Sequence, residues 1–395
     1  MSMSSNFDEV IDRRNTSAYK LRDCKDSNTV ALGLADMDFR TAEPVVKAVT
    51  NAANFSLYGY VQPAGDYFDS FIEWSKKHYR WDIEREWISY TPGVIAGIGG
   101  AVRVLTEPGD EVIFQTPAFS LFTELTVSNG RVPAHNPMLY RDGKYSIDFD
   151  DLEVKAQSPR AKMLILCNPH NPTCRVLTED ELLRIGEICL RNNIVIVSDE
   201  VHCDMIFGNR KHISIASLSD ALLQNTITCM SPTKTFNMAG LQISVNVIAN
   251  PELRKKFELD CLSRDSKRPN IFGMIGFAAA YKEGHQWLDE VRTYIRSNID
   301  FAECYLQEHA PLLKMIDCEG TYLMWIECSA LGLKGKALGD FFINEANVLV
   351  VSGNGFVDNA DAFIRLNPAC PRSVLTEGLK RICAAVKGKM NQIQG

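Results

Sequence analysis

The sequence predicts an α/β protein in which helices cover a mostly parallel central sheet, with a smaller α+β domain after it. Short apolar runs alternate with amphipathic helical patterns from about residue 43 onward, as in a parallel sheet covered on both faces. Several runs end in a charged residue or a proline-rich loop, where open α/β sheets place their ligands. From about residue 285 the pattern changes to a long helix followed by short strands, which indicates the second domain.

The composition is that of an ordinary globular protein. The 395 residues are 46% hydrophobic and 23% charged, which is enough chain for two or three domains. The net charge of -7 is mild and the basic residues are not clustered, so nucleic acid is not a predicted partner. The uncharged stretch 94–102 is too short to span a bilayer, and the first residues lack the basic and apolar regions of a signal peptide. We expect no membrane partner.

The 12 cysteines indicate a reducing compartment. No two of them are three residues apart, so neither a zinc ribbon nor a thioredoxin-like pair is predicted, and we expect no metal site. Cys167 and Cys229 close apolar runs, where a reduced thiol packs as a small hydrophobic group. We infer a cytoplasmic protein.

The first elements follow from proline, glycine and apolar spacing. Residues 1–40 are polar with few periodic elements. A helix is predicted from residue 43, because Pro44 stands at a favoured first helical position and apolar residues recur at helical spacing. A second amphipathic helix is predicted over 65–79.

The stretch 91–100 is typical of a strand end that feeds a helix. Exposed N–H groups at such a helix start bind phosphate, and the helix dipole adds to the attraction. A dinucleotide fingerprint is the alternative, but Val102 stands where its third glycine belongs and the glycines fall inside the helix. We therefore favour phosphate binding by the backbone of Gly93, Val94 and Ile95.

Short apolar runs mark the strands of the central sheet. They cover 111–115, 162–167, 194–198, 226–230 and 243–248. Thr178 and Glu181 form a capping box that starts a helix ending near Asn192. The segment 116–119 is a predicted loop, and the two prolines of Asn168-Pro-His-Asn-Pro172 forbid regular structure there. In the second domain, strands are predicted over 322–326, 348–351 and 363–368.

Three ionisable residues stand where chemistry is expected. Lys234 follows the run 226–230, and partial desolvation at that strand end would lower its pKa and make it an amine nucleophile and proton carrier. Asp199 directly follows an apolar strand, where a carboxylate needs a partner. Arg365 lies within an apolar strand, and its planar fork suits a carboxylate. A surface lysine and an internal arginine ion pair are the structural alternatives.

The ordered motifs resemble one family. The pattern Ser-x-x-Lys-x-Phe-Asn-x-x-Gly-Leu, which starts at Ser231, is similar to the cofactor-lysine segment of fold-type I pyridoxal phosphate (PLP) enzymes. The likeness continues through Phe7-Asp-Glu-Val-Ile-Asp-Arg-Arg14, Ala35-Asp-Met-Asp-Phe39, Tyr58-Gly-Tyr60, Thr91-Pro-Gly-Val94, Asn168-Pro-His-Asn-Pro172, Ser198-Asp-Glu-Val-His202 and Arg365-Leu-Asn367. Within that fold the chain most resembles aminotransferase-like carbon–sulfur β-lyases, including cystathionine β-lyases of the MalY/PatB kind.

The resemblance implies three parts of the chain and a set of catalytic roles. The parts are an N-terminal arm over 1–40, a large PLP-binding domain over 41–284 and a small domain over 285–395. Lys234 would hold the cofactor as a Schiff base, Asp199 would pair with the protonated pyridine nitrogen and keep the ring electron-poor, and Arg365 would bind the substrate α-carboxylate.

The resemblance also implies further cofactor contacts. Asn171 would hydrogen-bond the phenolic oxygen and Ser231 would bind the phosphate. Tyr60 would reach the phosphate in the neighbouring subunit, which predicts a homodimer. Phe119 would stack on the pyridine ring and His202 would lie near the phenolic oxygen, but a purely structural role is equally open for both residues.

Three positions depart from the family pattern. Phe119 stands where the β-lyases usually have tyrosine, so a proton-handling hydroxyl is excluded there. Thr173-Cys174 replaces residues where a glycine is expected, which could alter the loop or bring a thiol near the site. Gln242 stands where many aminotransferases have an arginine for the phosphate.

The function that the resemblance implies is PLP-dependent carbon–sulfur β-lyase activity. The substrate would be cystathionine or a related sulfur-containing amino acid, and the products pyruvate, ammonia and a thiol. An aminotransferase is the alternative, since it would use the same residues. A hypothesis of another class is a regulatory protein that binds a transcription factor, as some relatives do.

Overall fold

The computed structural model describes residues 5–394. Residues 1–4 of the predicted arm and Gly395 of the predicted small domain lie outside the described residues. The boundaries proposed after residues 40 and 284 stay predictions. The second coincides with the start of the long helix α11 (His285–His309).

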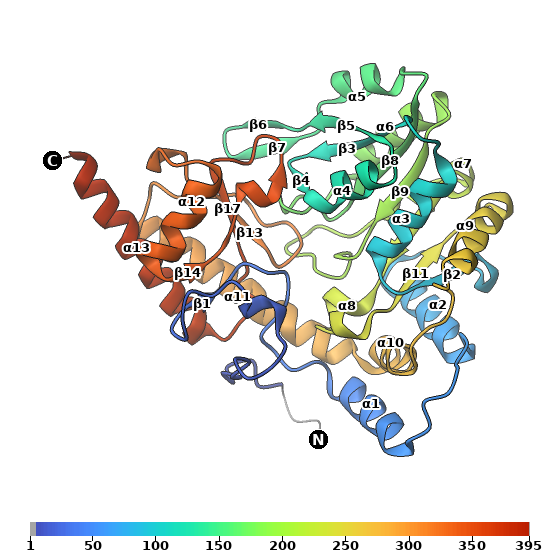
Figure 1. The fold of residues 1–395 in the computed structure, drawn as a ribbon, viewed down its shortest axis with the longest axis horizontal. Coiled ribbons are helices and arrows are strands. Elements are labelled where there is room, and N and C mark those ends of the chain that lie inside the picture. Colours follow the sequence, from blue (N-terminus) through green and yellow to red (C-terminus); the bar gives the residue numbers. More distant parts are fainter. Residues whose placement is uncertain (1–4, 395) are drawn as a thin grey trace.

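A seven-stranded sheet forms the centre of the molecule (Figure 1). In spatial order its strands are β2 (Ile88–Thr91), β11 (Ser244–Val247), β10 (Thr226–Met230), β9 (Val195–Asp199), β8 (Ala161–Cys167), β3 (Glu111–Thr116) and β5 (Val132–Pro137). Pairing is parallel from β10 to β5, and only β11 runs against its two neighbours. The predicted mostly parallel sheet is confirmed.

Helices cover both faces of this sheet because its buried strands carry apolar side chains on both sides. One face packs against α3 (Val94–Leu105), α4 (Ser120–Ser128) and α9 (Pro251–Ser263) through residues such as Ile165 and Val197. The other face and the β2 end of the sheet pack against α1 (Glu43–Phe55), α2 (Gly65–Tyr79), α5 (Phe149–Ala156), α6 (Glu179–Arg191), α7 (Asp220–Gln224) and α10 (Ile271–Glu283).

The predicted helix signals are borne out. Pro44 stands in the first turn of α1, the helix over 65–79 is α2, and the capping box of Thr178 and Glu181 is formed at the start of α6. The glycines of 97–100 lie within α3, as predicted. A β-carbon on Gly97 would stand 2.2 Å from Oδ1 of Asn246, so this glycine allows the helix to approach the sheet closely.

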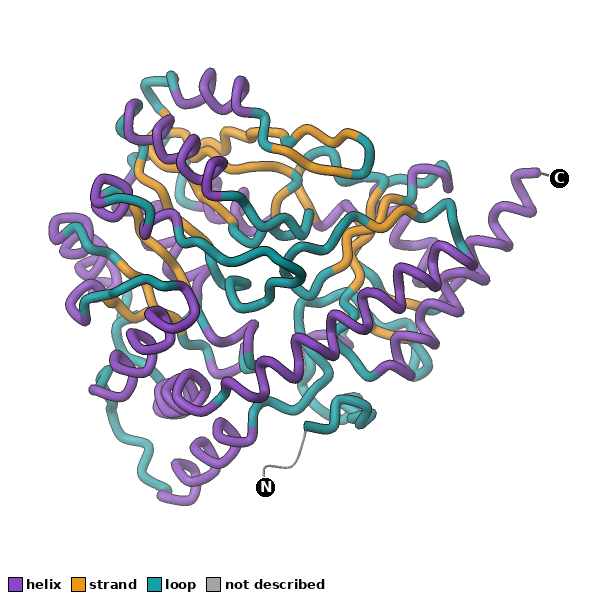
Figure 2. Tube along the Cα trace, turned by 180° about the vertical axis from the view of Figure 1, so that it is seen from behind, coloured by secondary structure: helices purple, strands orange, loops and turns teal. Residues whose placement is uncertain are grey.

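A second sheet, antiparallel and four-stranded, carries the substrate-binding candidate Arg365. Its order is β12 (Lys314–Met315), β13 (Met324–Glu327), β17 (Phe363–Leu366) and β15 (Val351–Ser352). Helices α11, α12 (Gly335–Phe341) and α13 (Arg372–Gln394) accompany it, and Figure 2 shows α11 running from the end of α10 to lie beside α13. The α+β character predicted for this part is confirmed.

Two expectations about strands are corrected. The predicted strand 348–351 is two strands, because β14 (Val348–Leu349) pairs with β1 (Val30–Ala31) of the arm while β15 pairs with β17. The predicted loop 116–119 contains β4 (Ala118–Phe119), which pairs with β16 (Phe356–Val357). Both segments find partners far away in the sequence.

The remaining elements are short. A hairpin is formed by β6 (Leu139–Arg141) and β7 (Lys144–Ser146), and α8 (Pro232–Thr235) follows β10. Single 3-10 turns occupy Tyr19–Leu21, Arg85–Trp87, Ile215–Ser217, Ala239–Leu241, Ser329–Leu331 and Gly353–Gly355, and a π-helical turn occupies Phe342–Ala346. Within residues 5–394, none of the helices combines the length and apolarity needed to cross a bilayer.

Candidate active site

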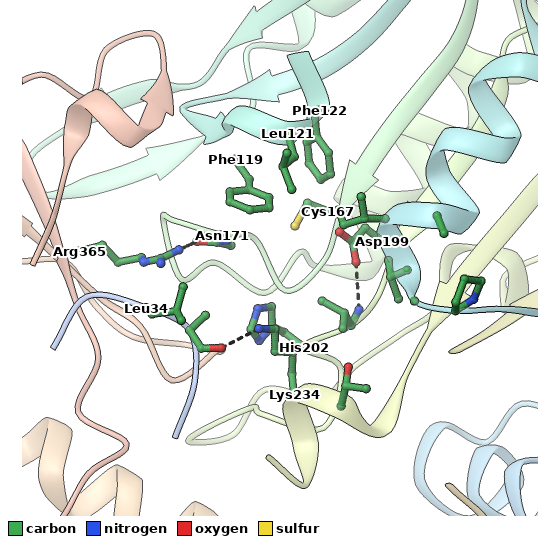
Figure 3. Close-up of a pocket in the computed structure, with 18 residues that line it drawn as sticks. Leu34, Phe119, Leu121, Phe122, Cys167, Asn171, Asp199, His202, Lys234 and Arg365 are labelled. Atoms are coloured by element: carbon green, nitrogen blue, oxygen red, sulfur yellow. Dashed lines mark hydrogen bonds between the residues drawn. The ribbon is translucent and has the colours of Figure 1, made fainter. Parts of the chain in front are cut away.

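A cavity of about 350 Å³ lies where the parallel strands end and the second sheet begins (Figure 3). Nine of the predicted site residues line it: Gly93, Val94, Ile95, Phe119, Asn171, Asp199, His202, Lys234 and Arg365. Strand ends and loops that are distant in the sequence thus deliver them to one place, as expected at the carboxyl edge of an open α/β sheet.

Lys234 lies in α8, directly after the central strand β10. Its Nζ donates a hydrogen bond of 2.6 Å to the carbonyl oxygen of Ala35 in the arm. Burial, with the nearby charge of Arg365, lowers the pKa of Lys234 to about 8. A substantial fraction of this amine is therefore neutral near physiological pH, as a nucleophile or proton acceptor must be.

Asp199 ends β9 and is only 6% exposed. Its Oδ1 accepts a hydrogen bond of 3.2 Å from the N–H of Val201, and no ion pair joins it to a basic side chain of residues 5–394. Burial raises the pKa of Asp199 to about 6. The charge of Lys234 acts on this carboxylate from beyond ion-pair distance, and a buried carboxylate without an ion pair is costly unless a cation binds there.

Arg365 lies on β17 and is 4% exposed. Nη1 donates to Oδ1 of Asn171 at 3.0 Å, Nη2 donates to the carbonyl oxygen of Gly33 at 3.1 Å, and Nε has no hydrogen-bond partner within residues 5–394. No carboxylate in the described chain lies within ion-pair distance of the guanidinium, and burial lowers its pKa to about 10. The internal ion pair considered from the sequence is therefore wrong, and the arginine lacks an anion.

His202 is 3% exposed, and its Nδ1 has no hydrogen-bond partner among the residues that the structure describes. Burial and the charges of Lys234 and Arg365 lower its pKa to about 3. The imidazole is therefore neutral at pH 7, so one ring nitrogen can donate a hydrogen bond and the other can accept one.

The first turn of α3 forms the opposite end of the cavity from Arg365 (Figure 3). Gly93 is its N-cap, with φ of +140°, a conformation that favours glycine. No side chain of the described part of the chain caps this end, so backbone N–H groups of the first turn remain available to an anion.

The match to a protein family agrees with this geometry. A model of the aminotransferase class I and II family matches residues 27–382. The chain belongs to this family.

Relatives within the family cover essentially the whole chain. Cystathionine β-lyase PatB of Bacillus subtilis is 36% identical over 385 residues, 96% of this chain and 100% of that protein. Cystalysin of Treponema denticola, whose crystal structure contains pyridoxal 5'-phosphate, superimposes with a TM-score of 0.94 at 33% identity over 98% of this chain and 100% of that chain. A PLP-bound C–S lyase of Staphylococcus hominis gives a TM-score of 0.91 at 32% identity over 98% and 99%. The fold-type I resemblance is confirmed.

Two residues predicted for the phosphate of this family's cofactor do not line the cavity. The Ser231 hydroxyl donates to the carbonyl oxygen of Ile243 at 2.6 Å and accepts from the N–H of Thr233 at 3.2 Å, so it caps α8. Tyr60 is 92% exposed, with the Arg268 guanidinium 5.2 Å from its ring centre. Their roles at a phosphate stay predictions.

The departures from the family pattern have different consequences. Cys174 is buried away from the cavity, where its Sγ donates to the carbonyl oxygen of Leu323 at 2.7 Å. The loop bends at Cys174 with φ of +62°, as a glycine would. Gln242 is exposed and has φ of +49°. The thiol at the cavity is instead that of Cys167, which ends β8.

Several lining residues were assigned no role from the sequence, although Ala35, Val201 and Thr233 lie within the motifs that carry the family resemblance. They include Leu34 and Ala35 of the arm, Leu121 and Phe122 of α4, Val201 and Thr233. Apolar side chains and backbone atoms carry no chemical signature, so only spacing from a recognised residue could have indicated them. Val201 stands two residues after Asp199, and Thr233 directly precedes Lys234.

Proposed function

We propose that this protein is a PLP-dependent carbon–sulfur β-lyase that converts cystathionine or a related cysteine S-conjugate to pyruvate, ammonia and a thiol. The observation that carries the proposal is the meeting of Lys234, Asp199 and the unpaired Arg365 in one cavity. The lyase reaction, as opposed to another reaction of the family, is supported by the relatives named as cystathionine β-lyase and C–S lyase.

The cavity has the polar groups that PLP requires. Asp199 lacks a cation and would face the pyridinium nitrogen, while the N–H groups of Gly93, Val94 and Ile95 would hold the phosphate. Asn171 and His202 would bind the phenolic oxygen. Once bound, the cofactor would supply an electron sink for negative charge at the substrate α-carbon.

The flat faces of the cofactor ring would contact apolar side chains. Phe119 lines the cavity and is held by the pairing of its strand with β16. A phenylalanine offers a stacking surface but no hydroxyl, so proton transfer falls to other residues. Val201 also lines the cavity and is the second apolar side chain that we assign to the ring.

The chain's own residues would bind and deprotonate the substrate. Arg365 would hold the α-carboxylate through paired N–H groups, with Asn171 and Gly33 fixing the guanidinium from the other side. Lys234 would hold the cofactor until the substrate amine displaces it, and its free amine, with a pKa of about 8, would then take the α-proton. Loss of the thiolate from the β-carbon would follow.

Incubation with cystathionine in the absence of any keto acid tests the proposal. A lyase should release pyruvate and thiol in equal amounts, whereas an aminotransferase should form product only after a keto acid is added. Product that depends on the keto acid would overturn the lyase assignment and leave the aminotransferase. A substrate panel with cystine and smaller cysteine conjugates would define the leaving group.

We also propose a homodimer in which Tyr60 reaches the neighbouring site. Exposed apolar side chains support a contact with a second copy of the chain, because Phe55, Leu57, Tyr58 and Tyr60 follow one another on a single exposed segment. A reducing compartment such as the cytoplasm is supported by the 12 free thiols, most of them buried. The regulatory role remains a hypothesis that a pull-down with a Lys234→Ala variant would test.

A further inference from the structure

The hydrogen bond of Lys234 to Ala35 belongs to a larger set of contacts around the arm segment 33–39. The carbonyl oxygen of Ala35 accepts from Nζ of Lys234 at 2.6 Å and from the hydroxyl of Tyr322 at 3.3 Å. Ala35 lines the cavity together with Lys234. A backbone carbonyl therefore stands within reach of the amine that is proposed to move the substrate proton.

Asn367 fixes the peptide groups on both sides of this carbonyl. Its Nδ2 donates to the carbonyl oxygens of Leu34 at 2.7 Å and Asp36 at 3.0 Å. Its own Oδ1 is held by the N–H of Ala369 at 2.8 Å, and the side chain is fully buried. Asn367 thus holds the carbonyl groups before and after Ala35, and the Ala35 carbonyl between them is directed at Lys234.

A second asparagine ties the same segment to the turn that follows the helix of Lys234. Asn237, three residues after Lys234, accepts from the N–H of Met37 at 3.1 Å and donates to the carbonyl oxygens of Met37 at 3.1 Å and Phe39 at 2.7 Å. At the other end, a β-carbon on Gly33 would lie 3.1 Å from the backbone of Val350. The segment is thus fixed on both sides of Ala35.

We propose that the Ala35 carbonyl is the docking point of the free Lys234 amine and that Asn367 is a positioning residue for proton transfer. The inference rests on the proposed function, because it requires Lys234 to act as a free amine. A neutral amine that donates one N–H to Ala35 keeps its lone pair for the substrate.

The hydrogen bond to Ala35 would hold Nζ of Lys234 in place both before and after it takes the α-proton of the substrate. The proton passes from the substrate α-carbon to Nζ, and the electron pair of the broken C–H bond stays with the substrate. The resulting ammonium donates a stronger, charge-assisted hydrogen bond to the same carbonyl oxygen. Misplacing the amine by about 1 Å is enough to slow such a step by about 100-fold.

The test is Asn367→Asp, which keeps the size and the Oδ1 acceptor but removes the Nδ2 donor. The matched control is Asn298→Asp, since Asn298 is also buried and also donates to two carbonyl oxygens, those of Pro368 and Cys370. We expect Asn367→Asp to lower kcat for cystathionine by about 10- to 100-fold with little change in KM. The isotope effect with α-deuterated substrate should increase. The control should lower Tm without these changes.

A measurement without cofactor gives a second readout. In the cofactor-free protein at about pH 10, acetic anhydride should label Lys234 several-fold faster in Asn367→Asp than in wild type, because a released amine is more accessible. Asn237→Asp should change both readouts in the same direction by a smaller factor, which keeps the test usable if Asn367→Asp does not fold.

The outcomes separate this inference from the proposed function. Wild-type labelling rates and an unchanged isotope effect in Asn367→Asp, with only a lower Tm, would reduce Asn367 to a structural residue and overturn the inference. Failure of the wild-type protein to release pyruvate without a keto acid would overturn the proposed function, while the labelling experiment would still decide whether Ala35 docks the amine.

Discussion

Arg365 donates a hydrogen bond of 3.0 Å from Nη1 to Oδ1 of Asn171, so the residue proposed for the substrate carboxylate touches the residue proposed for the cofactor oxygen. Arg365 lies on β17 of the second sheet, whereas Asn171 lies in the loop that follows β8 of the central sheet. Under the proposed roles, this hydrogen bond would fix the substrate relative to the cofactor, because each would be bound by one partner of the same pair.

Replacing Arg365 by lysine should weaken substrate binding. A point charge cannot reproduce the paired N–H groups, and a hydrogen bond to a charged group is worth about 1.5–3 kcal/mol, so KM for cystathionine should rise by about 10- to 100-fold. Steady-state kinetics measure this. Arg103→Lys is the control, since Arg103 pairs with Asp260 away from the cavity, and its kinetics should match wild type. An unchanged KM in Arg365→Lys would contradict the carboxylate role.

The pKa of Lys234 can be measured in the cofactor-free protein. Labelling with an amine reagent at varied pH should be half-maximal near pH 8, since burial and the positive charge of Arg365 lower this pKa to about 8. In the urea-unfolded chain the same peptide should titrate near the ordinary lysine value of about 10.4. In Arg365→Met the midpoint should move up, because removal of a neighbouring positive charge favours the ammonium form. A folded midpoint equal to the unfolded one would show that Lys234 is solvated.

Asp199→Asn should stabilise the cofactor-free protein while impairing cofactor binding. Burial raises the pKa of Asp199 from 3.8 to about 6, so the ionised form destabilises the fold above pH 6. At 1.36 kcal/mol per pKa unit this amounts to at most about 3 kcal/mol. The gain in Tm should therefore be full above pH 6 and disappear as the pH falls from 6 toward 4.

Asp204 is a buried aspartate for which the same substitution should lower Tm, in contrast to Asp199. It is also buried, but its oxygens accept hydrogen bonds from Trp74, Tyr79 and Thr235. Asp204→Asn would bring an NH2 group against these donors and should lower Tm by the equivalent of about 1–3 kcal/mol. If both substitutions changed Tm equally, Asp199 would be as well supplied with hydrogen-bond donors as Asp204, which would contradict this prediction.

The crossing of Tyr60 can be tested by mixing two inactive variants. Lys234→Ala and Tyr60→Ala subunits should each be impaired alone. If Tyr60 acts in the neighbouring subunit, a mixed dimer has one site with both residues intact, and an equimolar exchanged mixture should regain about one quarter of wild-type activity. If a tag on one variant co-purifies the other, mixed dimers are present, and no recovery of activity in that mixture would place Tyr60 in its own subunit's site or outside both.

The left-handed backbone of Cys174 predicts an order of stabilities. Its φ is +62°, a conformation that is about 1–2 kcal/mol less favourable for a residue with a β-carbon than for glycine. Cys174→Gly and Cys174→Ala both lose the hydrogen bond to Leu323, but only glycine relieves the strain. In urea denaturation the glycine variant should be more stable than the alanine variant by about 1 kcal/mol. The reverse order would contradict this account.

The sequence by itself determined the fold class and the catalytic candidates. Asp199 could be recognised because it is a charged residue at the end of an apolar strand, Lys234 because it follows one closely, and Arg365 because it lies within one. Parallel strands bring their carboxyl ends to one edge, so local patterns were enough to predict that the first two residues meet. The long helix α11 followed from its periodicity alone.

Only the tertiary structure decided which groups each candidate contacts. Lys234 meets a carbonyl oxygen at Ala35, which lies 199 positions earlier in the chain, and every residue has a backbone carbonyl, so no side chain marks the partner. The same holds for the Ser231 hydroxyl, which donates to the backbone carbonyl oxygen of Ile243. It also holds for the segment 348–351, whose two halves pair through backbone groups with strands of two different sheets. Pairings between distant segments depend on how the whole chain packs, whereas strand and helix patterns depend on neighbouring residues.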